Sequence, residues 1–131
     1  MSVIVFGSIN MDLVARTPRL PVPGETLSGR SFETIPGGKG ANQAVAVARL
    51  GVPTQMIGRV GGDSFGRDLI ESLRSSQVRC DSVFIDAEVA SGVAMIAVDD
   101  NSENHIIIIP GANGRVEIGR ASCRERVSLL V

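Results

Sequence analysis

Short apolar runs and helix-like repeats alternate along this 131-residue chain. The run VIVFG (3–7) is apolar without alternation, which is typical of a strand buried on both faces of a parallel sheet. TQMIGRV (54–60) and SVFI (82–85) predict two further strands of the same kind. Because helix-like segments separate these strands, the pattern predicts an α/β fold.

Two segments repeat apolar residues at the spacing of an α-helix. Gly51 is placed to end the first helix, and Asp63 or Ser64 can cap the start of the second. The shared faces consist of Ala41, Ala44, Val45 and Ala48 in the first helix and of Phe65, Leu69 and Leu73 in the second.

The remaining segments predict a smaller β element beside the main sheet. Prolines 18, 21 and 23 make residues 8–25 an extended, turning connection, and TLSGRSFETI (26–35) has weak strand character. SGVAMIAVDD (91–100) and ENHIIIIPGAN (103–113) flank a hairpin-like turn at Asn101–Ser102.

Composition narrows the functional classes. The net charge is −1 and aromatic residues make up 3% of the chain, with no Trp or Tyr, which argues against nucleic-acid or anionic-membrane partners. No apolar run approaches a membrane span, and the start lacks the features of a signal peptide. Cys80 and Cys123 have no metal-ligand spacing and are expected to be reduced thiols. We therefore expect one soluble, cytoplasmic domain.

The stretch PGGKGANQA (36–44) is the first candidate for chemistry. A glycine-rich loop that leads into a helix exposes backbone N–H groups at a positive dipole end, which favours anions. The known phosphate fingerprints are not met, however, because Glu33 and Gly40 break the Walker pattern and Gln43 breaks the dinucleotide pattern.

A polyhydroxylated ligand suits the side chains of this stretch better. Lys39 and Asn42 are three residues apart at a helix start, so they can share one face. The ammonium donates hydrogen bonds, the amide donates and accepts them, and the glycines let a ligand approach the backbone. The alternative is a tight strand-to-helix connection in which the glycines only permit packing.

Asn10 and Asp12 are a second candidate pair. They follow the first strand, and ligands of open α/β sheets bind at the carboxyl ends of strands. The alternative is a turn in which both side chains cap local backbone groups. His105, the only histidine, is expected on the surface of a strand, and Asp63 and Ser64 of GDSFG (62–66) are expected to cap a helix and not to provide a nucleophile.

Together these motifs resemble the ribokinase-like, PfkB family of carbohydrate kinases. The resemblance covers residues 3 to about 116, and GGKGANQA together with NMD is most similar to the members that act on ribose. It rests on GSINMDLV (7–14), PGE (23–25), PGGKGANQA (36–44), Gly51, Gly61, GDSFG (62–66), SGVA (91–94) and PGAN (110–113).

The resemblance implies a ribokinase-like fold, with part of a parallel sheet, its helices and a small β lid around residues 13–35 and 91–109. In such kinases the lid covers the sugar and commonly pairs with a partner lid in a homodimer. Apolar lid residues such as Ile96 or Ile108 are then candidates to face the sugar ring.

The resemblance also implies roles for five residues. Asp12 is expected to accept hydrogen bonds from sugar hydroxyls, Gly38, Lys39 and Asn42 to contact other hydroxyls, and Asn10 to support the same wall. The family's second signature, D-T-x-G-A-G-D, carries the catalytic aspartate and has no match here. The sites for ATP, Mg²⁺ and K⁺ belong to the same missing half.

The expected function is therefore the sugar-binding, N-terminal portion of an ATP-dependent sugar kinase, with ribose as the first candidate substrate. A portion that lacks the catalytic half is expected to be inactive on its own. Another sugar or a nucleoside is the alternative substrate. A non-catalytic sugar-binding or dimerisation module is the alternative class.

The end of the chain changes character. IGRASCRERV (118–127) matches one reading frame of a common sequencing-adapter oligonucleotide. We therefore expect residues 1–117 to be the kinase-like part and residues 118–131 to be a non-native tail. A basic helix is the alternative interpretation of this stretch.

Overall fold

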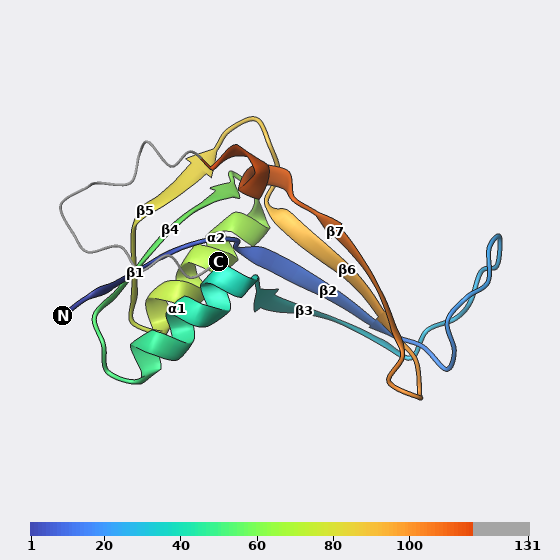
Figure 1. Ribbon diagram of the computed structural model, residues 1–131. Helices are drawn as coiled ribbons and strands as arrows, with labels where there is room; N and C mark the ends of the chain where they lie inside the picture. Colours follow the sequence, from blue (N-terminus) through green and yellow to red (C-terminus); the bar gives the residue numbers. More distant parts are fainter. Residues whose placement is uncertain (117–131) are drawn as a thin grey trace.

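The computed structural model describes residues 1–116, which form two sheets and two α-helices (Figure 1). The first sheet is parallel, with the order β1-β4-β5, and consists of β1 (Val3–Phe6), β4 (Thr54–Gly61) and β5 (Val78–Asp86). The helices α1 (Lys39–Arg49) and α2 (Ser64–Ser75) lie against it. The predicted α/β fold is confirmed.

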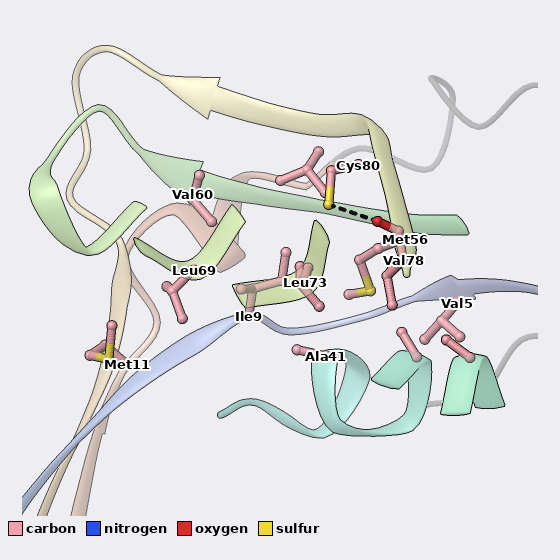
Figure 2. Close-up of a cluster of buried hydrophobic side chains, with 13 residues drawn as sticks. Val5, Ile9, Met11, Ala41, Met56, Val60, Leu69, Leu73, Val78 and Cys80 are labelled. Atoms are coloured by element: carbon pink, nitrogen blue, oxygen red, sulfur yellow. Dashed lines mark hydrogen bonds between the residues drawn. The ribbon is translucent and has the colours of Figure 1, made fainter. Parts of the chain in front are cut away.

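The main core lies between this sheet and the two helices (Figure 2). Small residues on α1 bring the helix close to the sheet, whereas α2 contributes the larger Leu69 and Leu73. The predicted helix faces are confirmed, with Val45 and Phe65 partly buried at the margin. The buried members of this core are Val5, Ile9, Met11, Ala41, Ala44, Ala48, Met56, Val60, Leu69, Leu73, Val78, Cys80 and Val83.

The second sheet is mixed, and it extends away from the core as an arm (Figure 1). Its order is β3-β2-β6-β7, with β2 and β6 parallel and the two outer pairs antiparallel. We call this sheet the lid. Its strands are β2 (Asn10–Arg16), β3 (Ser31–Gly37), β6 (Gly92–Val98) and β7 (Asn104–Ile109), and the 3₁₀ helix η1 (Gly111–Arg115) follows β7.

Both predicted helix boundaries are confirmed. Gly51 has a φ of +82° just after α1, and its N–H donates to the carbonyl of Ala48 at 2.9 Å. The Oδ1 of Asp63 accepts from the N–H of Gly66 at 2.8 Å, which caps α2. His105 lies exposed on β7, as predicted.

Two segments differ from the prediction. The strand expected over 82–85 begins at Val78, because Val78 and Cys80 are buried and alternate with the exposed Arg79 and Asp81. The connection expected over residues 8–25 contains a whole strand, β2. This strand lies between β3 and β6, so hydrogen bonds to both neighbours stabilise it although its local sequence gives only a weak strand signal.

Residues 117–131, which include the adapter-like stretch and Cys123, lie outside the described part of the chain. Cys80 is a free, buried thiol in the core. Neither α-helix of residues 1–116 has both the length and the apolar character needed to cross a lipid bilayer.

Candidate functional site

All five residues singled out in the sequence line a single groove between the lid and the start of α1, with a volume of about 470 Å³. We call it the lid groove. Ile96 and Ile108, the two apolar lid candidates, line it as well. The complete lining is Ser8, Asn10, Asp12, Gly38, Lys39, Asn42, Ala94, Ile96, Ile106, Ile108, Pro110 and Asn113.

Strand alternation explains why polar and apolar side chains lie side by side on one face of the lid. Asn10 and Asp12 are two residues apart on β2, so their side chains lie on the same face of the lid. The register places Asp12 beside Ala94 of β6, and Ala94 beside Ile108 of β7. One strand therefore provides amide and carboxylate groups, and its neighbours provide an apolar surface.

The carboxylate of Asp12 has no hydrogen-bond or ion-pair partner within residues 1–116. It is half-buried, and this desolvation raises the pKa of Asp12 above its ordinary value. The local backbone capping considered from the sequence is not observed for Asp12 among these residues. Its oxygens therefore remain available to accept hydrogen bonds from a ligand in the groove.

Two glycines lie in close contact with the start of β2 and with Asp12. Gly38 has a φ of +97°, and a Cβ there would lie 2.6 Å from the carbonyl oxygen of Ser8. A Cβ on Gly37 would lie 2.5 Å from Oδ2 of Asp12. Gly38 is therefore required by the backbone conformation, and Gly37 is required by the space that the Asp12 carboxylate occupies.

Lys39 and Asn42 project from the first turn of α1, which Gly38 begins without a side-chain cap. Both residues are exposed, and neither side chain has a hydrogen-bond or ion-pair partner within the described part of the chain. Lys39 is also the only lysine of the whole sequence. Donors and acceptors from the helix start thus face the groove without internal partners.

Asn113 is a groove residue that the sequence analysis did not single out, although it ends the quoted motif PGAN. Its side-chain amide accepts from the N–H of Ile9 at 3.0 Å and donates to the carbonyl of Ile9 at 3.1 Å. It also donates to Oδ1 of Asn10 at 2.6 Å. Asn10 is therefore held in place by η1. The motif PGAN was the sequence signal from which a role for Asn113 could have been inferred.

The lining of the groove suits a neutral, hydroxyl-rich ligand. Its charged lining residues are Lys39 and Asp12, whose formal charges cancel. The unpaired carboxylate disfavours a phosphate, while amide, ammonium and carboxylate groups together match hydroxyls that both donate and accept. Apolar side chains on β6 and β7 can cover the C–H face of such a ligand.

Within residues 1–116, no group of three or more His, Cys, Asp or Glu side chains could hold a metal ion.

Comparisons with known proteins identify relatives of this chain. Residues 1–119 match the model of the pfkB family carbohydrate kinases. A ribokinase of Schizosaccharomyces pombe is 43% identical over 132 residues, which cover 96% of this chain and 42% of that protein. A deoxyribokinase of Salmonella typhi is 43% identical over 113 residues, which cover 86% of this chain and 37% of that protein.

The fold is also similar to that of solved structures. The structure of Arabidopsis thaliana ribokinase complexed with ribose and ATP superposes with a TM-score of 0.79 at 38% identity, over 86% of this chain and 36% of that one. The chain thus spans about two fifths of the length of these relatives. Because the family model covers most of its residues, the chain belongs to the pfkB family of carbohydrate kinases.

Proposed function

We propose that this chain is the sugar-binding portion of an ATP-dependent sugar kinase and that its sugar is ribose. The observation that carries the proposal is the unpartnered, half-buried carboxylate of Asp12 beside Lys39 and Asn42 in one groove. Ribose as the substrate is supported by the S. pombe relative, named a ribokinase, and by the A. thaliana ribokinase structure, which contains ribose.

In this proposal Asp12 accepts hydrogen bonds from two sugar hydroxyls. Lys39 and Asn42 bind other hydroxyls, and the backbone at Gly38 lies close enough to contact the ring substituents. Asn10 supports the polar wall, while Ile96 and Ile108, which lie on the same face of the lid, pack against an apolar part of the ring. A hydrogen bond to a charged group contributes about 1.5–3 kcal/mol, so Asp12 is the strongest single anchor.

Deoxyribose is the second candidate substrate, because a relative of equal identity is named a deoxyribokinase. The two sugars differ by one hydroxyl, which is the kind of difference that polar groups in a site can discriminate. Another sugar or a nucleoside remains the broader alternative within the family.

The phosphoryl donor in this proposal is ATP, which the A. thaliana ribokinase structure contains. Mg²⁺ and K⁺ complete the proposed cofactors. We propose that residues outside this chain hold all three and that the chain alone transfers no phosphate, because the D-T-x-G-A-G-D signature is absent from its sequence. Formation of ribose phosphate by the pure 131-residue chain would contradict this part.

We also propose that the lid pairs with a second lid in a homodimer. All six residues of β7 are exposed, and so are all residues of β3 except Gly37. Large apolar side chains on these strands and on β6, including Phe32, Met95 and Ile107, face solvent. Sedimentation of the protein across a range of concentrations would test whether this surface mediates self-association.

The decisive test uses the protein made from its complete gene. Ribose and a nonhydrolysable ATP analogue are titrated separately into wild type, Asp12→Ala and Lys39→Ala. Both variants should lose ribose affinity, by about ten- to a hundredfold for Asp12→Ala, with nucleotide affinity unchanged. Arg79→Gln, far from the groove, is the control. If Lys39→Ala weakened nucleotide binding first, the loop would be a phosphate site.

Chemical modification of Lys39 gives an independent test on the same protein. Acylation of Lys39, followed by peptide mass spectrometry, should slow when ribose is present, while acylation of the amino group of Met1 should not change. Equal rates with and without ribose would contradict a role for Lys39 in the sugar site.

A further inference from the structure

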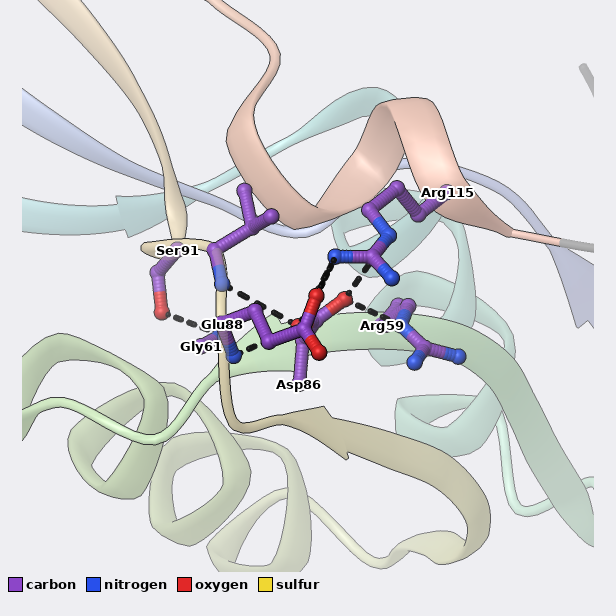
Figure 3. Close-up of polar contacts among 7 residues, drawn as sticks. Arg59, Gly61, Asp86, Glu88, Ser91 and Arg115 are labelled. Atoms are coloured by element: carbon purple, nitrogen blue, oxygen red, sulfur yellow. Dashed lines mark hydrogen bonds and ion pairs between the residues drawn. The ribbon is translucent and has the colours of Figure 1, made fainter.

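A cluster outside the lid groove joins segments that lie far apart in the sequence (Figure 3). At its centre is Asp86, the last residue of β5, which is only 2% exposed. Its Oδ2 accepts from Nε of Arg59 on β4 at 2.8 Å, and Nε of Arg115 on η1 lies 3.3 Å from the same oxygen. We call Asp86, Arg59 and Arg115 the Asp86 cluster.

The second carboxylate oxygen of Asp86 binds the loop that leads into the lid. Its Oδ1 accepts from the backbone N–H groups of Glu88 at 2.9 Å and Val89 at 3.1 Å. These hydrogen bonds, together with the one from Arg59, lower the pKa of Asp86 to about 2. The carboxylate is therefore ionised at physiological pH and holds the loop and the helix η1 at once.

The helix η1 connects this cluster to the lid groove. Arg115 lies at its end, and Asn113, two residues earlier, holds both backbone groups of Ile9 and the side chain of Asn10. Directly before Asn113, the N–H of Ala112 donates to the carbonyl of Ala90 at 2.8 Å. A shift of η1 would therefore displace Asn113 and its hydrogen bonds to Ile9 and Asn10, at the start of the strand that carries Asp12. We call these hydrogen bonds the Asn113 clamp.

We propose that Asp86 is a positioning residue for the lid groove: through Arg115 and the loop over residues 87–90 it holds η1, so that Asn113 fixes the polar wall of Asn10 and Asp12. The inference rests on the proposed function, because it assigns to that wall the binding of a sugar. Asp86 itself does not line the groove.

Stability alone is a poor explanation for such an arrangement. Replacing buried ion pairs by apolar residues is often neutral or stabilising, because desolvation of the charges offsets their attraction. Arg59 and Asp86 already pair between neighbouring strands, so the contact from Arg115 adds little to the sheet. What Arg115 adds is a fixed orientation of η1.

The test compares Asp86→Asn and Arg115→Gln with Val78→Ala in the protein made from its complete gene. Val78 is a buried core residue at the opposite end of β5, so its variant lowers stability without touching the cluster. The first readout is hydrogen exchange of the Ile9 amide, which donates to Asn113, relative to that of Met56 in the central strand β4. The second readout is the dissociation constant for ribose.

We expect both cluster variants to accelerate Ile9 exchange relative to Met56 and to weaken ribose binding by about two- to thirtyfold. Val78→Ala should change neither the exchange of Ile9 relative to Met56 nor the dissociation constant for ribose, although this variant should unfold at a lower temperature. Arg115→Gln decides the question if Asp86→Asn does not fold, because Arg115 is 44% exposed and its loss leaves the Arg59 contact intact.

Unchanged Ile9 exchange in the cluster variants would overturn the inference, and so would an equal loss of ribose affinity in Val78→Ala. If the wild-type protein bound no ribose, the proposed function would fail. The exchange of Ile9 would still decide whether the Asp86 cluster positions the clamp, so the two failures are distinguishable.

Discussion

The surroundings of Asp12 and Asp86 differ in almost every respect. Asp86 is surrounded by two arginines and two backbone donors, whereas Asp12 has no hydrogen-bond or ion-pair partner within residues 1–116. The pKa of Asp86 is lowered to about 2, and that of Asp12 is raised. A carboxylate that the fold satisfies holds structure together, and one that the fold leaves unsatisfied is free for a ligand.

This difference gives the two residues opposite effects on stability. The lowered pKa of Asp86 stabilises the folded state above the ordinary value of 3.8, and this contribution is lost as the pH falls through about 2. The raised pKa of Asp12 means that the folded state prefers its protonated form. The unfolding free energy therefore falls as the pH rises from 3.8 to the raised pKa of Asp12, and this loss is complete above that pKa.

The largest effect is expected from Gly38→Ala, which should disrupt the groove at its floor. The φ of +97° and the close approach of the Ser8 carbonyl combine backbone strain with overpacking, for a loss of about 2–6 kcal/mol in unfolding free energy. Gly51→Ala is the matched control, because Gly51 also has a positive φ but no atom within 4 Å of an added Cβ. Equal losses in urea unfolding would show that the close approach does not matter.

Asp12→Asn should separate binding from stability. Ribose affinity should fall by about ten- to a hundredfold, because the amide replaces one acceptor oxygen with a donor. The unfolding free energy at pH 7 should rise, because an unpartnered, partly desolvated charge is removed.

Asp86→Asn, measured in the same way, should instead lower stability. Calorimetric unfolding of both variants checks the pair, and a loss of stability in Asp12→Asn would mean that its carboxylate has a partner in the folded protein.

The acid limb of the stability curve should depend on Asp86. Wild type should lose unfolding free energy as the pH falls from about 3.8 towards 2, and Asp86→Asn should show a shallower decline over that interval. Urea titrations at half-unit steps of pH measure the two slopes. Parallel slopes would indicate that other carboxyl groups dominate acid unfolding.

The smallest effect is expected for an exposed ion pair on the lid. Arg30 and Asp100 are 2.7 Å apart, but their side chains are 59% and 54% exposed. Arg30→Gln should therefore change the unfolding free energy by less than about 1 kcal/mol and leave ribose affinity unchanged. A larger change in either quantity would mean that this pair, unlike most exposed pairs, orders the lid.

Features set by neighbouring residues were predictable from the sequence. The faces of α1 and α2, the glycine after α1 and the cap at Asp63 all depend on residues within one or two helical turns, and the structure has each of them. The strand β2 was missed as a continuous element because its partners, β3 and β6, begin 21 and 82 residues after its own first residue, Asn10.

The sequence by itself determined the family motifs, the α/β alternation and the five polar and glycine positions that line one groove. Tertiary structure alone decided that Asn113 clamps Ile9, across 104 residues of chain, and that Arg59, Asp86 and Arg115 meet. It also decided which aspartate has partners, because each of these contacts depends on how β4, β5, η1 and the lid pack. Local spacing carries no information about such packing, since the residues that meet are separated by whole elements.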